Sequence, residues 1–186
     1  KFRPDFFPKN VREEKGFFEF DFCFGNESLG HIKLSVPGRH NLKNALAAGG
    51  CAFLLGIDAD VIRSSLSAFS GVKRRLEFKG FYNGAALYDD YAHHPTEISA
   101  SLRALKKMTD KKLICLFQPH TYSRTAALFT GFVSALSLAD EVILAPIYAA
   151  REKYTEKISS KNLSDSLRAH GCAASIFSNF NEIAEH

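Results

Sequence analysis

Tryptophan is absent from the 186-residue sequence and methionine occurs once, whereas phenylalanine occurs 17 times. The large apolar side chains available for a core are therefore mainly phenylalanines, and we expect a Phe-rich core. Basic and acidic residues are nearly balanced, at 24 and 20, which gives a net charge of +4. The basic residues are scattered, and so mild a charge favours anionic small molecules such as nucleotides over nucleic acid.

Paired cysteine motifs and long apolar runs are missing as well. The four cysteines, Cys23, Cys51, Cys115 and Cys172, are far apart and form no C-x-x-C pair, which argues against a zinc knuckle or a disulfide framework. No apolar stretch approaches the length of a membrane span, and the first residues do not resemble a signal peptide. We therefore expect reduced thiols, no membrane partner and a cytoplasmic location.

The first 70 residues predict a β-hairpin followed by two helices. Phe17–Phe24 and Gly30–Val36 alternate in polarity and are separated by turn residues, as in a hairpin. Asn41–Leu55 predicts a buried, Ala-rich helix, and Asp58 or Asp60 can cap a shorter helix after it. A hairpin offers little sheet to cover so apolar a helix. We therefore interpret this segment as the end of a larger domain.

From about Val72 the pattern changes to strands that alternate with helices. Helical crossovers of this length give a mainly parallel, doubly wound sheet, so the prediction is a Rossmann-like α/β fold. We expect a domain boundary near residues 70–72, which separates residues 1–70 from residues 71–186. The expected strands are Ala85–Tyr88, Leu113–Phe117, Glu141–Ala145 and Ala174–Phe177, and the expected helices are Thr96–Lys107, Ser123–Leu136, Lys161–His170 and one that begins near Asn181.

The densest polar cluster is DDYAHHPTE at residues 89–97, directly after a predicted strand. Ligands of a doubly wound sheet bind at the carboxyl ends of strands, so two acids and two histidines here indicate a binding site. Two other interpretations stay open. Asp90 and Thr96 could simply cap the next helix. Aspartate and histidine could also bind a metal ion, as in metal-dependent phosphoesterases, although we find no distant partners for such a site.

A second cluster, QPHTYSRT at residues 118–125, follows the next predicted strand. Arg124 near a helix start can bind a carboxylate or phosphate, assisted by the amides of the helix N-terminus. His120 and Tyr122 could orient a small polar ligand. The alternative is a surface loop in which Ser123 caps the helix. We expect the loops at 89–96 and 118–125 to lie side by side at the carboxyl edge of the sheet.

A third cluster surrounds the start of the first predicted helix, in GRHNLKNAL. Asn41 and Asn44 are three residues apart and therefore share a helix face. A carboxamide offers a donor and an acceptor, which the edge of adenine requires, although asparagine at a helix start is also a common N-cap. Arg74 and Arg75, near the expected boundary, suit phosphate groups or form a solvated basic patch.

Together these segments resemble the Mur ligases of peptidoglycan synthesis, most closely the branch that adds L-alanine. The matching runs occur in the family's order and cover nearly the whole chain; they are GRHNLKNALAA, GVKRRLEFKG, LYDDYAHHPTEI, FQPHTYSRT and ADEVILAPIYAARE. The resemblance implies an ATP-dependent ligase that uses ATP and Mg²⁺ to join L-alanine to UDP-N-acetylmuramate in the cytoplasm, for cell-wall biogenesis. Residues 1–70 would end its central ATP-binding domain, and residues 71–186 would form its C-terminal Rossmann-like domain.

The resemblance also implies roles for individual residues. Arg124 would bind the carboxylate of L-alanine, with His120 and Tyr91 nearby, and His93 and His94 would line the catalytic part of the site. The residues on the ATP side would be His40, Asn41, Asn44, Arg75 and Asp90.

Two departures from the family pattern affect these expectations. Many members have arginine at the position of Thr121, so Arg124 is expected to hold the carboxylate alone. The family's Gly-x-x-Gly-Lys-Ser/Thr phosphate loop does not occur in this sequence, so we expect the isolated chain to be inactive and to bind ATP weakly. Two alternatives stay open: another ligase of the superfamily, of the tripeptide-recycling or folate type, or a non-catalytic Rossmann-like binding module.

Overall fold

The computed structural model describes residues 5–185, which form two compact units. The first unit comprises the described residues up to Tyr91 together with Lys107–Thr109, and the second comprises Ala92–Lys106 and the described residues from Asp110 onwards. The division thus falls later in the chain than the predicted boundary near residues 70–72. A division into compact units does not show which residues belong to which domain of the family, so the boundary near residues 70–72 stays a prediction. Within residues 5–185 no helix has both the length and the apolar character needed to cross a membrane.

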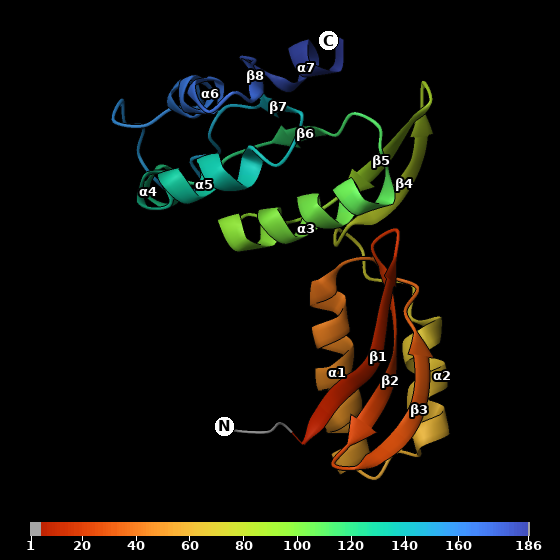
Figure 1. The fold of residues 1–186 in the computed structure, drawn as a ribbon. Helices are drawn as coiled ribbons and strands as arrows, with labels where there is room; N and C mark the ends of the chain where they lie inside the picture. Colours follow the sequence, from red (N-terminus) through yellow and green to blue (C-terminus); the bar gives the residue numbers. More distant parts are fainter. Residues whose placement is uncertain (1–4, 186) are drawn as a thin grey trace. The chain divides into compact units, whose positions relative to one another are not determined.

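The first unit contains a three-stranded antiparallel sheet of order β1-β2-β3 (Figure 1). Its strands are β1 (Phe6–Glu14), β2 (Phe17–Phe24) and β3 (Glu27–Lys33). The predicted hairpin is confirmed in β2 and β3, although β3 begins and ends earlier than expected. The strand β1 escaped prediction because its sequence, FFPKNVREE, contains proline and asparagine, which are rare in strands.

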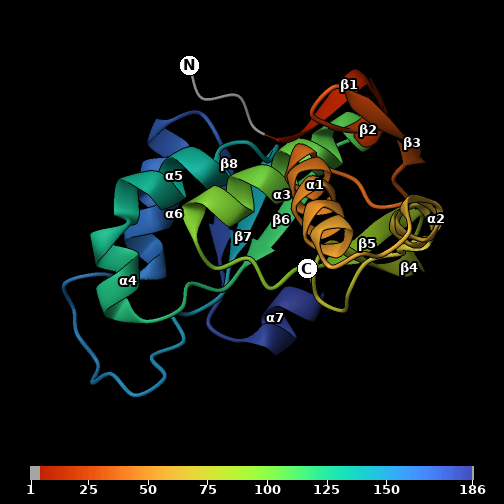
Figure 2. The same ribbon diagram turned by 90° about the horizontal axis from the view of Figure 1, so that it is seen from below.

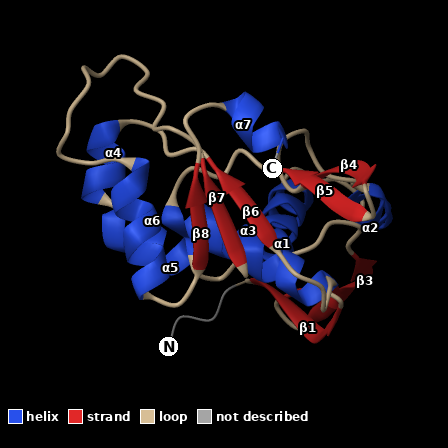
Figure 3. Ribbon diagram, turned by 90° about the horizontal axis from the view of Figure 1, so that it is seen from above, coloured by secondary structure: helices blue, strands red, loops and turns tan. Residues whose placement is uncertain are grey.

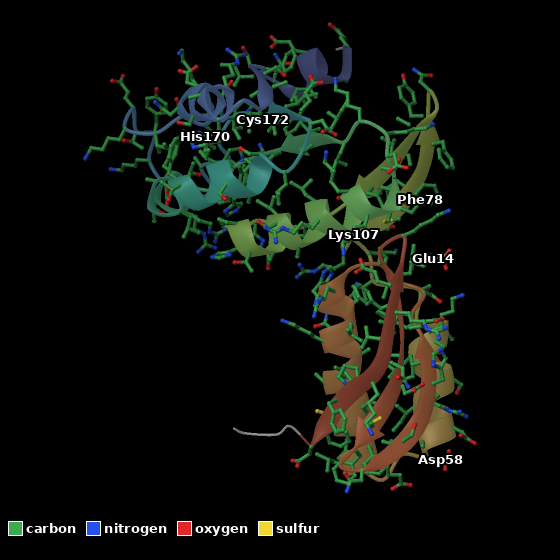
Figure 4. The ribbon with its side chains drawn as sticks, in the orientation of Figure 1. Glu14, Asp58, Phe78, Lys107, His170 and Cys172 are labelled. Atoms are coloured by element: carbon green, nitrogen blue, oxygen red, sulfur yellow. The ribbon has the colours of Figure 1, made fainter. Side chains whose placement is uncertain are left out.

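Two helices, α1 (Arg39–Leu54) and α2 (Ala59–Ala68), pack against one face of this sheet. That face carries the buried side chains of Phe18, Phe20 and Phe22, which confirms the Phe-rich core. The carboxylate of Asp58 caps α2 by accepting the N–H of Asp60 at 2.8 Å, so the cap is the first of the two expected aspartates (Figure 4).

A separate two-stranded antiparallel sheet joins β4 (Glu77–Tyr82) to β5 (Ala85–Asp89). The prediction that the strand at 85–88 belongs to the parallel sheet is therefore wrong. Asn83 and Gly84 connect the two strands with φ values of 47° and 81°. An Asn-Gly dipeptide with positive φ at both residues is the preferred turn of a tight hairpin, and it directs β5 back along β4.

The second unit contains a parallel sheet of order β6-β7-β8 (Figure 3), which confirms the predicted α/β class. The predicted helix at 123–136 is divided in two, because the backbone leaves helical geometry at Leu128, where φ is −111° and ψ is 19°. The strands are β6 (Ile114–Phe117), β7 (Glu141–Leu144) and β8 (Ala173–Ile176), and the helices are α3 (Pro95–Met108), α4 (Tyr122–Ala127), α5 (Phe129–Leu136), α6 (Ser160–Ala169) and α7 (Phe180–Glu185).

Helices α3, α5 and α6 share one hydrophobic core with the sheet of the second unit (Figure 2). Its fully buried members include Phe132, Leu136, Val142, Leu144, Leu163 and Leu167. Because β6 and β7 are parallel, the loops that follow them leave from the same edge of the sheet. Helix α3 packs on this sheet and ends just before β6 begins, so its first turn lies at that edge too. The fold therefore gathers the polar loops of the second unit at the carboxyl edge.

Candidate functional site

The loops after β6 and β7 are joined by backbone hydrogen bonds beyond the ends of their strands. Thr121 N–H donates to Tyr148 O at 2.8 Å, and Tyr148 N–H donates to Pro119 O, also at 2.8 Å. His120 forms a parallel bridge with Tyr148 between these bonds. The second predicted cluster is thus an ordered extension of the ladder rather than a loose surface loop.

His120 is half-buried in this extension, and its ring lies 5.3 Å from the ring of Tyr148. The Nδ1 atom of His120 is buried and has no hydrogen-bond partner among the described residues. A buried polar atom without a partner costs free energy, so this nitrogen is a candidate contact for a polar ligand.

Helix α4 begins with a left-handed residue that also caps it. Thr121 has a φ of 64°, and its Oγ1 accepts the N–H of Arg124 at 3.3 Å. The buried Thr125 donates its hydroxyl to Thr121 O at 2.6 Å. The alternative in which Ser123 caps this helix is therefore wrong, because Thr121 has that position. Arg124 is half-buried and projects from the third residue of α4.

Glu152, which the sequence analysis did not single out, binds the same helix start. Its carboxylate accepts the N–H of Ser123 at 3.0 Å and also accepts the Ser123 hydroxyl. The hydroxyl hydrogen bond, followed by the amide one, lowers the pKa of Glu152 below its ordinary value of 4.5. The two residues are 29 positions apart. Only the parallel pairing of β6 with β7 brings them together, and the sequence gives no local sign of the contact.

The two histidines of the first cluster lie at the start of α3. His94 Nδ1 accepts the N–H of Thr96 at 3.3 Å, and the carboxylate of Glu97 accepts the N–H of His93 at 3.1 Å. Glu97 also lies 3.7 Å from His93 Nδ1. In the capping alternative, which named Asp90 and Thr96, Thr96 does not act as the cap, because it donates its own N–H to His94. The part of that alternative that concerns Asp90 stays a prediction. His94 therefore contributes to local structure whatever else it does.

In the first unit, the start of α1 carries three of the residues predicted for the ATP side: His40, Asn41 and Asn44. His40 is half-buried, and burial lowers its pKa below the ordinary 6.5. The carboxylate of Asp90 opposes this shift and Arg75 adds to it, so both charges lie close enough to act on the imidazole. Burial therefore disfavours the charged form of His40, and one carboxylate and one guanidinium act on its ring.

Asn41 and Asn44 share a helix face, as predicted. The side chain of Asn44 donates to Asn41 Oδ1 at 3.2 Å, and the side chain of Asn41 donates to Pro37 O at 2.8 Å. The N-cap of α1 is Gly38, so the interpretation of these asparagines as caps is wrong. Asn41 is engaged locally and orients Asn44, whose exposed carboxamide faces solvent.

Tyr91 pairs with Arg74 in the first unit. The Arg74 guanidinium lies 4.5 Å from the centre of the Tyr91 ring, and Tyr91 N–H donates to Arg74 O at 2.8 Å. Arg124 and His120 belong to the second unit. The residues predicted for L-alanine are thus divided between the two units, and the prediction that the 89–96 and 118–125 loops lie side by side stays untested for residues 89–91.

A parallel α/β unit of the Rossmann-like class, with polar loops at its carboxyl edge, follows a segment in which Asn41 and Asn44 share a helix face. Residues 74–186 match the family described as "Mur ligase, glutamate ligase domain". The chain belongs to the Mur ligase family.

The relatives narrow the comparison to one branch. The chain is 48% identical over its whole length to the UDP-N-acetylmuramate–L-alanine ligase of Caldicellulosiruptor saccharolyticus, of which it covers 41%. Over 85% of the chain it is 48% identical to the protein of the same name from Clostridium perfringens, of which it covers 35%. It therefore spans well under half the length of these curated relatives.

Solved structures agree with this comparison. The UDP-N-acetylmuramate–alanine ligase of Thermotoga maritima aligns with a TM-score of 0.80 and 27% identity, covering 98% of this chain and 39% of the other. A folylpolyglutamate synthase from Mycobacterium tuberculosis aligns with a TM-score of 0.71 at 18% identity, over 97% of this chain and 40% of the other. The second likeness shows a shared fold alone.

Proposed function

We propose that the protein containing this chain is a cytoplasmic enzyme that joins L-alanine to UDP-N-acetylmuramate at the expense of ATP. The observation that carries the proposal is the 48% identity along the complete chain to enzymes of that name. The TM-score of 0.80 with a solved enzyme of the same name supports it.

On the ATP side, we assign the adenine edge to Asn44, the phosphates to Arg75 and the ribose hydroxyls to Asp90. An exposed carboxamide held by Asn41 suits a base edge, since it presents both a donor and an acceptor. The charges of Arg75 and Asp90 both act on the His40 imidazole, so we assign this group of side chains to one nucleotide site.

On the amino-acid side, Arg124 would bind the carboxylate of L-alanine, with Tyr91 and the buried Nδ1 of His120 as further polar contacts. His93 and His94 would line the reacting end. In the reaction, the muramyl carboxylate takes the γ-phosphoryl group of ATP and ADP leaves. The amine of L-alanine then attacks the carbonyl of the acyl phosphate, and inorganic phosphate and a proton are released. These side chains would act mainly by orientation and electrostatics.

Magnesium would neutralise the phosphate charge in such a reaction. Within residues 5–185, no group of three or more His, Cys, Asp or Glu is arranged to hold a metal ion. Magnesium is usually held by one or two carboxylates together with the phosphates of the nucleotide, so we assign the ion no ligand among these residues.

The test is phosphate release by the full-length protein with ATP, MgCl₂ and UDP-N-acetylmuramate. We expect release that depends on L-alanine, and a product heavier by one alanine residue in mass spectrometry. An intact tripeptide and L-glutamate serve as competing amines, and a preference for either would replace the proposal with another activity of the superfamily. The isolated chain, assayed in parallel, is expected to release no phosphate.

A further inference from the structure

Glu152 belongs to the loop after β7, but its side chain completes the start of α4. Its carboxylate accepts both the amide N–H and the hydroxyl of Ser123. Its own amide donates to Ala149 O at 3.0 Å, which closes a turn next to Tyr148. Because Tyr148 pairs with the backbone on both sides of His120, the carboxylate is presented from an anchored loop.

The start of α4 needs such support. Thr121 has a left-handed φ of 64°, which is unfavourable for a β-branched residue. The helix has six residues, so it has little cooperative stability of its own. Bonds from outside the helix are therefore needed to hold Thr121, Ser123 and Arg124 in one geometry.

The same bonds determine how an incoming carboxylate can be recognised. The N–H of Ser123 is engaged by Glu152, and the N–H of Arg124 is engaged by Thr121 Oγ1. The helix amides that we expected to assist Arg124 are thus already used. A second anion at these amides would also be repelled by the Glu152 carboxylate. Within this helix start, the guanidinium of Arg124 is therefore the group that can bind a substrate carboxylate.

We propose that Glu152 is a positioning residue for the amino-acid substrate: it fixes the backbone from which Arg124 projects and keeps the carboxylate of L-alanine on the guanidinium. This inference rests on the proposed function, because it takes L-alanine as the ligand of Arg124. Nothing in the chemistry requires Glu152 to touch the substrate.

The test uses the full-length protein with Glu152→Ala, Glu152→Gln and Ser123→Ala, and with Glu156→Ala as a control. Glu156 is an exposed glutamate in the same loop. We expect Glu152→Ala to raise the KM for L-alanine about tenfold, which corresponds to the free energy of one charge-assisted hydrogen bond. The KM for ATP should change less than about twofold. Glu152→Gln should recover part of the loss, since its amide oxygen still accepts the Ser123 N–H. The double variant Ser123→Ala/Glu152→Ala should be no worse than Glu152→Ala.

A second measurement, amide hydrogen exchange of residues 121–127, should show faster exchange in Glu152→Ala and no change in Glu156→Ala.

Equal rises in the KM for L-alanine and for ATP would indicate a general structural role and overturn the inference, as would unchanged exchange. If the wild-type protein shows no L-alanine-dependent phosphate release, the proposed function fails, and the role of Glu152 in L-alanine binding fails with it. If the wild type is active and Glu152→Ala binds L-alanine normally, only the inference about Glu152 fails.

Discussion

Removing the guanidinium of Arg124 should raise the KM for L-alanine and leave the KM for ATP nearly unchanged. The backbone of Arg124 is held by Thr121 Oγ1, so Arg124→Ala removes the side chain without removing the bond that positions it. A guanidinium–carboxylate contact contributes about 1.5–3 kcal/mol. Each 1.4 kcal/mol corresponds to about a factor of ten. Because Arg124 is only half-buried, solvent screening favours the lower part of that range, so the KM for L-alanine should rise about ten- to thirtyfold.

The assay is phosphate release by the full-length protein, with L-alanine varied at saturating ATP and then ATP varied at saturating L-alanine. Arg151→Ala, an exposed arginine beside Glu152, is the matched control and should leave both KM values unchanged. Adding Thr121→Arg to Arg124→Ala should lower the KM for L-alanine again but also lower the unfolding midpoint, because the Oγ1 cap is lost. If Arg124→Ala weakens ATP and L-alanine equally, Arg124 belongs to the phosphate site or to the fold, and its assignment is refuted.

Three further predictions use other contacts. Asp90→Ala should raise the KM for ATP about tenfold and leave that for L-alanine unchanged in the same assay; the reverse result would contradict the ribose assignment. Thr125→Val should lower the free energy of unfolding in urea by about 0.5–1.5 kcal/mol, because it removes the 2.6 Å hydrogen bond from the Thr125 hydroxyl to Thr121 O. The hydrogen bond from the Thr125 N–H to the same carbonyl is kept. A larger loss in Thr125→Val than in Thr125→Ala would refute this reasoning. A hydrogen bond from Lys106, followed by one from an amide, lowers the pKa of Asp140 below 3.8. Asp140→Asn should therefore be less stable than wild type above about pH 5, with the difference vanishing as the pH falls through the lowered folded-state pKa. A difference that persists at pH 2 would exclude the ion pair as its cause.

Most of the fold was predictable because its signals are local. The Phe alternation of β2, the capped start of α2 and the strand–helix periods of the second unit each depend on neighbouring residues. The strand β5 was assigned to the wrong sheet although a local signal was available. Asn83-Gly84 is a preferred hairpin dipeptide, so it predicts an antiparallel hairpin at this point more strongly than the surrounding α/β pattern predicts a parallel strand.

The candidate site residues were selected by residue type and position, and their roles stay predictions; the contacts that they make could not be predicted. The polar run at 118–125 does follow a strand of the parallel sheet, β6, whereas the run at 89–97 follows β5 of the separate antiparallel sheet. The contact between Ser123 and Glu152 depends on strand order, which the sequence did not specify. The hydrogen bond from Thr96 to His94 was not predicted for a different reason. Histidine is an uncommon helix cap, so the sequence favours a catalytic or binding role for its ring.

The cap on α3 also limits what His94 can do in the reaction. Its Nδ1 accepts the Thr96 N–H, so the neutral ring carries its proton on Nε2 and can donate to a ligand but not accept a proton from one. In the reaction that we propose, the ammonium of L-alanine must lose a proton before it attacks, and the Nε2–H of His94 cannot take that proton.

We therefore expect His94→Asn, which preserves a capping side chain, to keep the unfolding midpoint of the full-length protein and to lower kcat far less than a hundredfold at pH 8. Loss of a general base would lower kcat by about a hundred- to ten-thousandfold. A fall of that size in His94→Asn, with the fold intact, would show that the cap opens during turnover and that His94 transfers the proton after all.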